Sequence, residues 1–485
     1  MYDNFVCCKY FSRIGHDVLA ADPNAHSVLF CEKDVSDAQW RNLRGNIPVL
    51  TLVFAIFTLL ANFMRAFNLR VKGMSIVWLL FSLAYLSYLH GACIVFILSI
   101  ATGNFLLVKI FAQKEYFPLV VWSYNILFLL CNRIYEGYSF SIFGQQWAFL
   151  DNYRGSFRWH ICFNFDLTIV WESLVQFISF RSIISIVIFV NPENLAIKFY
   201  RFVTVSYFDF DGLSFIIDFH YILSSSIEEI DVPQNTNSVR NVTLNGFRWV
   251  LSLLLMELMT HLFYYNAFAN SDLWKHLSPM DVFIIGYGVL NFMWLKFLLI
   301  WRFFRFWSLI NGIEAPENMP KCINNCHNLE GFWKNWHASF NKWLVRYIYI
   351  PLGGSKKKLL NVWVVFTFVA IWHDLEWKLL SWAWLTCLFF IPELVLKSAA
   401  KAFQAQSSFG ECIFRELSAV AGAVTITCLM VANLVGFVVG PSGINWLLSS
   451  FLNKEGLPVL GGMLMTFYVG TKIMFHIDEA KQRSP

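Results

Sequence analysis

The stretch NVWVVFTFVAIWHDLEWKLLSWAWLTCLFF (361–390) decides the fold class. Two apolar runs flank a short polar string, His-Asp-Leu-Glu, at 373–376. A helix needs about 20 apolar residues to cross a bilayer, because each residue adds about 1.5 Å to a path of about 30 Å. Apolar runs of this kind recur along nearly the whole chain, so the sequence predicts an all-α polytopic membrane protein.

The composition argues against two broad classes of protein. Of the 485 residues, 57% are hydrophobic, 18% aromatic and only 14% charged. A disordered chain does not carry so much apolar surface, and a soluble globular protein has about 25% charged residues. The net charge of +5 is modest, and the basic residues cluster between the apolar runs, as the positive-inside rule requires. The charge therefore gives no reason to expect a nucleic-acid partner.

About ten transmembrane helices are expected. The apolar runs place them near 47–64, 74–89, 91–112, 117–131, 247–269, 281–300, 359–373, 377–396, 418–440 and 456–475. Two further stretches, 167–190 and 202–224, are ambiguous because charged residues interrupt them. Around the membrane domain (47–478) we expect a polar or interfacial N-terminal segment (1–46) and a C-terminal tail (479–485). The polar stretch 225–245 is expected to be an exposed loop, which carries a formal glycosylation sequon at Asn241.

Residues 301–358 differ in kind from the predicted spans, since they are basic, aromatic and too polar to cross a membrane. Aromatic residues recur there at three- and four-residue steps, at positions 333, 336, 340, 343 and 347. That spacing is typical of one face of an amphipathic helix. We expect a helix that lies at the membrane interface, with tryptophans at the level of the headgroups.

His373 is the first candidate for chemistry. An ionisable residue inside a membrane segment is costly, and it is by default a functional candidate. Because Asp374, Glu376 and Lys378 follow at once, we expect the helix to be broken there or to line an aqueous cavity. The alternative is a short interfacial turn between two spans, in which His373 is merely hydrogen-bonded.

The basic patch of Lys356, Lys357 and Lys358 precedes His373 by 15 residues. On a helix this separation spans about 22 Å. If the lysines lie at the cytosolic surface, a long thioester with phosphate groups could hold its head at the lysines and its carbonyl near His373. A simple positive-inside anchor is an equally valid interpretation of the patch, and the two are compatible.

Two other features are weaker candidates. His337 lies on the predicted amphipathic helix, and an imidazole suits proton transfer near neutral pH. The string Cys322-Ile-Asn-Asn-Cys326 lacks the second ligand pair that a tetrahedral zinc site needs, so we expect no metal there. A further interpretation makes the Cys322 thiolate the ligand of a haem iron.

These residues carry a family resemblance. The string FWKNWHASFNKWLVRYIYIPLGG (332–354), followed by WHDLEWKLLSWAWL (372–385), resembles the membrane-bound O-acyltransferase family. Within that family the chain is most similar to the glycerol-uptake-protein (Gup) branch, and less to Hedgehog acyltransferase. Matching stretches at 37–53, 139–165 and 317–326 extend the resemblance over most of 37–165 and 247–478.

The resemblance implies a helical bundle around a central tunnel and an acyl-CoA co-substrate, with no other cofactor required. It implies that His373 acts as the general base and that His337 positions or stabilises the reacting groups. In the Hedgehog branch the position equivalent to His337 is an aspartate. Around these residues we expect substrate contacts from Lys356, Lys357, Lys358, Arg346, Trp336, Trp372 and Asp374. The acceptor is expected to be a hydroxyl on a lipid or lipid-anchored molecule in the endoplasmic reticulum membrane, with a lyso-glycosylphosphatidylinositol lipid as the most specific candidate.

One departure from the family pattern concerns 166–200, which is expected to be an insertion because a family-like string resumes only at 201–211. If it disturbs the packing of helices, the chain could be a catalytically silent regulator of acylation. The branch name suggests another alternative, a transporter for glycerol or a similar polyol. Transporters usually have paired broken helices and internal repeats, and the sequence has one broken segment and no repeat.

Overall fold

The computed structural model describes residues 34–67, 94–111, 140–153, 239–270, 277–310, 315–373, 376–402 and 408–483, together with isolated short pieces between 114 and 128. Several expectations lie outside these residues. They are the span at 74–89, most of the span at 117–131, the ambiguous stretches 167–190 and 202–224, the insertion at 166–200, and Asp374.

Every element in the described ranges is helical. The long helices are α3 (Ala38–Ala66), α5 (Ile94–Phe111), α10 (Val239–Leu262), α12 (Pro279–Ile310), α15 (Lys358–His373), α16 (Trp377–Ala402), α17 (Ser408–Leu434) and α19 (Gly456–Arg483). The short ones are η3 (Phe140–Phe143), η4 (Gln145–Tyr153), α11 (Tyr265–Asn270), η6 (Ile323–Asn325), α13 (Leu329–Asn335), α14 (Ala338–Leu344), η7 (Val345–Tyr349), η8 (Gly354–Lys357), η9 (Val435–Val439), η10 (Pro441–Gly443) and α18 (Ile444–Phe451). The predicted all-α fold class is confirmed.

Six of the described helices are long and apolar enough to cross a membrane. They cover Ala38–Leu60, Val239–Leu262, Pro279–Ile310, Trp377–Val395, Gly410–Val439 and Gly456–Arg483. The chain is therefore a polytopic membrane protein. Helix α15 agrees closely with the predicted run at 359–373, but its 16 residues rise only about 24 Å, which is less than the hydrocarbon thickness.

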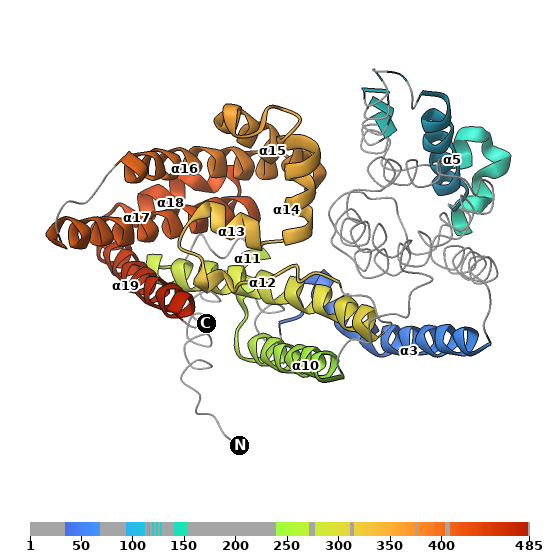
Figure 1. The fold of residues 1–485 in the computed structure, drawn as a ribbon, viewed down its shortest axis with the longest axis horizontal. Coiled ribbons are helices and arrows are strands. Elements are labelled where there is room, and N and C mark those ends of the chain that lie inside the picture. Colours follow the sequence, from blue (N-terminus) through green and yellow to red (C-terminus); the bar gives the residue numbers. More distant parts are fainter. Residues whose placement is uncertain are drawn as a thin grey trace. The chain divides into compact units, whose positions relative to one another are not determined.

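The chain divides into two compact units, which are described separately. The first takes in the described residues up to Asp37, 247–302 and 317–485, and it contains the bundle of α15, α16, α17 and α19. In this unit α15 packs on α16, α16 on α17, and α17 on α19, as Figure 1 shows. A second part of its core forms where Phe268, Ile285 and Val289 pack against Leu434 and Val435.

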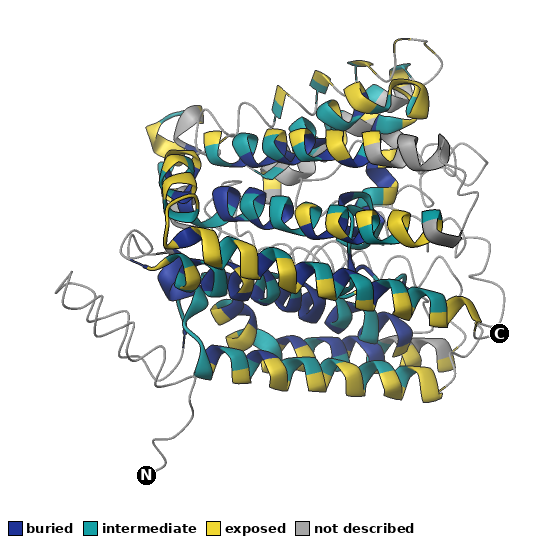
Figure 2. Ribbon diagram, turned by 90° about the vertical axis from the view of Figure 1, so that its left-hand side faces the viewer, coloured by how far each residue is buried: buried dark blue, intermediate teal, exposed yellow. Residues whose placement is uncertain are grey.

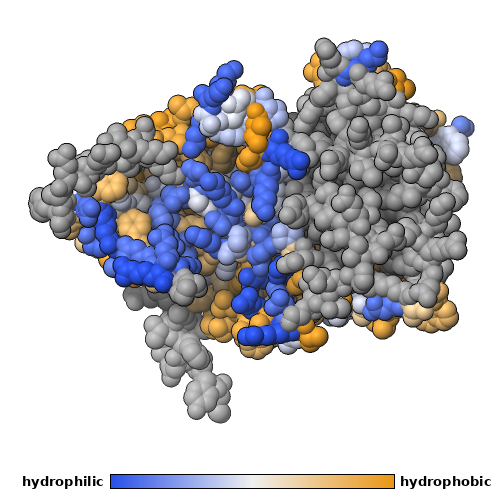
Figure 3. All heavy atoms as spheres, in the orientation of Figure 1, coloured by the Kyte–Doolittle hydropathy of each residue, from blue (hydrophilic) through white to orange (hydrophobic). Residues whose placement is uncertain are grey.

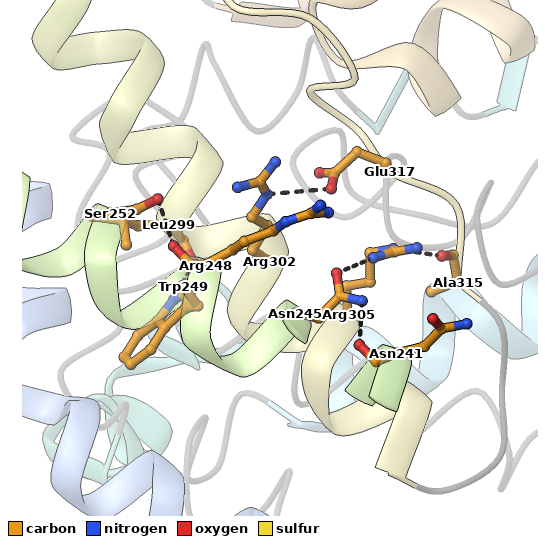
Figure 4. Close-up of polar contacts among 10 residues, drawn as sticks. All are labelled: Asn241, Asn245, Arg248, Trp249, Ser252, Leu299, Arg302, Arg305, Ala315 and Glu317. Carbon is orange, nitrogen blue, oxygen red and sulfur yellow. Dashed lines mark hydrogen bonds and ion pairs between the residues drawn. The ribbon is translucent and has the colours of Figure 1, made fainter. Parts of the chain in front are cut away.

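The second unit takes in 38–246 and 303–316. Phe54 of α3 stacks on Trp307 at a ring distance of 5.6 Å and meets Phe303 edge-on at 5.9 Å. At the end of α12, the Arg305 guanidinium donates hydrogen bonds to the Ala315 carbonyl and to the Asn245 side chain (Figure 4). These contacts fix the course of the last turns of α12 within this unit.

Exposed and buried positions alternate around the described helices, so that one side of a helix is open and the other packed (Figure 2). On α10 the open side carries large apolar residues: Phe247, Leu251, Leu254 and Leu258 are 59%, 49%, 60% and 53% exposed. Apolar residues open to this extent would be costly in water but not in lipid. This face is therefore suited to contact with acyl chains.

Lys296 is a charged residue inside the apolar helix α12, and the sequence analysis did not single it out. Its side chain is 7% exposed, and its Nζ lies 2.7 Å from the Asp37 carboxylate. A buried charge within a membrane span is tolerated when it is paired in this way. The ion pair ties the segment before α3 to the middle of α12 within the first unit.

Two predicted boundaries are wrong. Helix α12 continues to Ile310, so 301–310 belongs to that helix and not to the interfacial segment. The string WRFFRFWSLI (301–310) continues α12 although it is basic and aromatic. Helix α10 begins at Val239, so the second part of the expected loop at 225–245, including the Asn241 sequon, is helical. Thr243 donates a hydrogen bond to the Val239 carbonyl within that helix.

Candidate functional site

The interfacial segment is not one amphipathic helix, as its aromatic period predicted. It is broken between α13 and α14, at His337. His337 has φ 52° and ψ 58°, the left-handed region, and it is the single residue other than glycine with a positive φ in the described chain. Such a conformation costs about 1–2 kcal/mol for a residue with a Cβ atom, and it is found where surrounding contacts impose it. Figure 3 shows that hydrophilic residues gather over the segment between α12 and α14.

Helix α13 is held at its start by two side chains. Asn328 accepts a hydrogen bond from the Gly331 N–H at 2.6 Å, as an N-cap residue does. Glu393 of α16 accepts from the Leu329 N–H at 2.7 Å and from the Glu330 N–H at 3.4 Å. The Glu393 side chain is buried, and a carboxylate suits the positive end of a helix. The helix that precedes His337 is therefore tied to α16.

His337 is enclosed by aromatic rings. Its imidazole stacks on Trp301 of α12 at 4.5 Å and lies 5.2 Å from the Phe340 ring, and the residue is 7% exposed. Burial, and to a smaller degree the charge of His373, lowers the pKa of His337 to about 3. His337 is therefore a neutral imidazole at pH 7.

His373 is the last residue of α15, and α16 begins at Trp377. The predicted break in the helix after His373 is therefore confirmed, while residues 374 and 375, which connect the two helices, lie outside the described part of the chain. The His373 ring meets Trp382 edge-on at 5.7 Å. Trp382 is 2% exposed, and its indole N–H donates to the Asn433 side chain at 3.3 Å, which fixes the ring against His373.

A chain of aromatic rings runs from one histidine to the other. Trp382 meets Trp333 at 5.6 Å and Trp333 meets Phe332 at 4.9 Å. The chain continues over Phe332–Trp336, Trp336–Phe297 and Phe297–Trp301, each pair between 5.4 and 5.9 Å apart, to the ring of His337. The two histidines thus lie at the two ends of one aromatic enclosure built from α12, α13, α14, α15 and α16, in which His337 is buried and His373 is half-buried.

The sequence analysis did not assign Trp301, Trp333 and Trp382 to the site. Trp333 is the most informative, because its indole N–H is buried and has no hydrogen-bond partner among the described residues. A buried donor is usually satisfied. The aromatic richness of 301–343 was the available signal, but the sequence alone assigned it to a membrane interface.

The predicted phosphate-binding lysines lie at the other end of α15 from His373. Gly353 and Gly354, with φ 103° and 56°, form the turn before them. Lys356 and Lys357 are exposed, whereas Lys358 lies 3.5 Å from the Glu330 carboxylate. With 16 residues in the helix, the lysines and His373 are separated by about 24 Å.

The other residues predicted to contact substrate lie in different parts of the structure. Trp336 belongs to the aromatic chain, and Arg346 lies exposed in η7. Trp372 lies in the last turn of α15, next to His373, and nothing is described of its side chain; Asp374 lies outside the described residues. Trp336 is therefore linked to both histidines through the chain of aromatic rings, and no ring contact links Arg346 to that chain in the described residues.

The cysteines around η6 do not form a metal centre in the described part of the chain, where no group of three or more metal-binding side chains occurs. Burial raises the pKa of the Cys322 thiol, and it raises the pKa of Cys326 to about 11. Both shifts disfavour the thiolate that a haem iron would need. The structure gives the haem interpretation of Cys322 no support.

Comparison with known proteins identifies the family of the chain. A model of the membrane-bound O-acyltransferase family matches residues 166–434. Membrane-bound O-acyltransferase gup1 of Schizosaccharomyces pombe is 32% identical over 476 residues, which covers 93% of this chain and 81% of that protein. Its Saccharomyces cerevisiae counterpart GUP1 is 31% identical over 480 residues, covering 93% and 83%.

A more distant relative is the protein-cysteine N-palmitoyltransferase HHAT of Mus musculus, which is 27% identical over 194 residues, or 37% of this chain and 38% of that protein. The family model matches more than half of the chain, and the yeast relatives align over most of it. These matches confirm the resemblance to the Gup branch. The chain belongs to the membrane-bound O-acyltransferase family and is an acyltransferase with acyl-CoA as its co-substrate.

Proposed function

We propose that the chain transfers a long acyl group from acyl-CoA to a hydroxyl of a lipid or lipid-anchored acceptor, with His373 as the general base. One observation carries the proposal: His373 lies in an aromatic enclosure at one end of α15, and the other end of the same helix begins at the lysine patch. An acyl-CoA bound along α15 would hold its phosphates at Lys356 and Lys357 and its thioester near His373.

The chemical step needs no acyl-enzyme, because a thioester is already activated. His373 takes the proton of the acceptor hydroxyl while the hydroxyl oxygen attacks the thioester carbonyl. The new C–O bond forms, the C–S bond breaks, and the CoA thiolate leaves with the proton returned from His373. His337 is neutral at pH 7, so it adds no competing positive charge and can position the acceptor or His373 by a hydrogen bond.

The indole N–H of Trp333 supports this assignment. A buried donor with no partner among the described residues is suited to a substrate oxygen that develops negative charge. Trp333 also contacts Trp382, which contacts His373, so the donor belongs to the same enclosure. We assign Trp333 to the carbonyl oxygen of the thioester during attack.

For the acceptor we propose a lyso-glycosylphosphatidylinositol lipid in the endoplasmic reticulum membrane. Similarity to the Gup branch supports this choice. The mouse relative is a protein-cysteine N-palmitoyltransferase, so a protein with such a cysteine is the competing acceptor. A second function, polyol transport, is not favoured by any described feature and serves as an outcome of the test.

The experiment measures CoA release by the purified full chain in proteoliposomes that contain palmitoyl-CoA and one acceptor at a time. The acceptors are lyso-glycosylphosphatidylinositol, lysophosphatidylcholine and an N-terminal cysteine peptide. We expect CoA release that depends on the first acceptor and that is lost in His373→Gln. Release that depends only on the peptide would overturn the choice of acceptor. No release with any acceptor, together with glycerol flux into the vesicles, would overturn the acyltransferase assignment of this site.

A further inference from the structure

Helix α14 begins without the help of its own N-cap side chain. His337 occupies the N-cap position, where a side-chain oxygen normally accepts a hydrogen bond from an N–H of the first turn. An imidazole is a poor cap, and the His337 ring makes no capping hydrogen bond to α14. The ring instead faces Trp301 and Phe340.

A residue 19 positions earlier supplies the missing cap. The Asn318 side-chain oxygen accepts from the Ser339 N–H at 3.0 Å and from the Ser339 hydroxyl at 2.7 Å. The Asn318 main-chain carbonyl accepts from the Ala338 N–H at 3.0 Å. Asn318 is 5% exposed, so these bonds are shielded from water. The two residues that follow His337 are thus fixed by three bonds to one residue.

Asn318 is itself held in place by the same helix that carries the ring against His337. Arg302 of α12 donates from its Nε to the Glu317 carboxylate at 3.2 Å (Figure 4). Glu317 precedes Asn318, and Arg302 follows Trp301. One stretch of α12 therefore holds both the backbone after His337, through Arg302 and Glu317, and the Trp301 ring that stacks on His337. This explains how a left-handed backbone, which is costly for histidine, persists at this position.

We propose that Asn318 is a positioning residue, which by capping α14 in place of His337 holds the His337 backbone left-handed and its imidazole inside the aromatic enclosure. The inference rests on the proposed role of His337 in acyl transfer. Asn318 does not touch the substrate and acts through His337. Loss of the cap lets the backbone at His337 relax to an ordinary conformation, which turns the imidazole away from Trp301.

The test is a double-mutant cycle on the purified full chain, measured as kcat and KM for palmitoyl-CoA with the acceptor established above. Asn318→Ala removes the side-chain cap, and we expect kcat to fall about tenfold to hundredfold, as for a catalytic group displaced by about 1 Å. KM for palmitoyl-CoA should change little. Asn318→Asp keeps an acceptor oxygen at the same place and should restore kcat to within a few-fold of wild type.

The second arm asks whether the effect passes through His337. In the His337→Asn background, Asn318→Ala should cause no further loss of kcat, whereas independent structural effects would multiply. The matched control is Asn453→Ala, which removes a comparable asparagine cap, 2.6 Å from the Gly456 N–H at the start of α19, and should leave kcat unchanged. Ser339→Ala, which removes one of the three bonds, should give a smaller loss of kcat. It replaces Asn318→Ala in the test if that variant does not fold.

The outcomes separate the two proposals. If His337→Asn keeps the wild-type kcat, the proposed role of His337 is wrong. If His337→Asn loses activity while Asn318→Ala and Ser339→Ala both keep it, the positioning role of Asn318 is overturned. Equal losses in Asn318→Ala and Asn318→Asp, or losses that multiply with His337→Asn, would also contradict it.

Discussion

Gly436 offers a way to perturb the aromatic enclosure without touching either histidine. It lies in η9, the π-helical continuation of α17. A Cβ atom added there would lie 2.8 Å from the Trp382 Cδ1 atom and 2.9 Å from both its Cβ and Cγ atoms. Carbon atoms at rest are about 3.5–4.0 Å apart. Gly436→Ala therefore requires a displacement of roughly 0.6–1.2 Å.

Trp382 cannot yield easily to that displacement. Its ring is 2% exposed, meets Trp333 and Phe437 edge-on at 5.6 and 5.7 Å, and is hydrogen-bonded to Asn433. Overpacking of this kind costs about 1–3 kcal/mol. Trp382 also meets the His373 ring at 5.7 Å, so we expect a displaced Trp382 to shift His373. A shift of about 1 Å at a catalytic group lowers the rate by up to about hundredfold.

We therefore expect Gly436→Ala to lower kcat for palmitoyl-CoA turnover about tenfold to hundredfold and to destabilise the protein by about 1–3 kcal/mol in thermal unfolding in detergent. The matched control is Gly461→Ala in α19, where nothing lies within 4 Å of the added Cβ. That change should leave kcat unaltered and stabilise the helix by about 1 kcal/mol. Equal kcat values for the two variants would refute the claim that Trp382 positions His373.

Three further predictions concern other parts of the enclosure. The folded chain holds the pKa of His337 near 3 against 6.5 when unfolded, so the unfolded state binds more protons between these values. The free energy of unfolding should fall by up to about 1.4 kcal/mol per pH unit as the pH drops from 6.5 toward 3. This slope should be smaller in His337→Asn, because asparagine tolerates a left-handed backbone and has no imidazole to titrate. The same slope in both proteins would contradict the lowered pKa of His337. Glu393→Ala leaves the buried N–H of Leu329 unsatisfied and should destabilise by about 1–3 kcal/mol in thermal unfolding, whereas Glu393→Gln, which keeps an acceptor, should cost less; equal losses would argue against the capping role. Trp333→Phe keeps the ring but removes its N–H, so we expect kcat to fall tenfold or more with KM for palmitoyl-CoA unchanged, and an unaltered kcat would remove Trp333 from the mechanism.

Much of the fold class followed from the sequence because its signals are local. Apolar runs of spanning length predicted α15 and α16 closely, and the charged string after His373 predicted the break between them. A charge in an apolar segment is costly whatever the surrounding fold, so His373 could be selected before its neighbours were known. The lysine patch and His373 fell at opposite ends of one helix, as their spacing required.

The conformation of His337 could not be predicted in this way. The aromatic steps around it fit an unbroken helix, and the left-handed backbone depends on Asn318, 19 positions away in sequence. The pairing of Lys296 with Asp37 was hidden for the same reason, since it joins residues 259 positions apart. Contacts of this range are set by tertiary packing and leave no periodic signal in the chain.

The most direct test of the account is a single-turnover measurement with radiolabelled palmitoyl-CoA and lyso-glycosylphosphatidylinositol in proteoliposomes. Wild type is compared with His373→Gln and with the packing control Gly461→Ala. We predict that wild type and the control form the O-acyl lipid in step with CoA release, while His373→Gln binds palmitoyl-CoA but forms no product. Product formation by His373→Gln at the wild-type rate would contradict the assignment of His373 as the base.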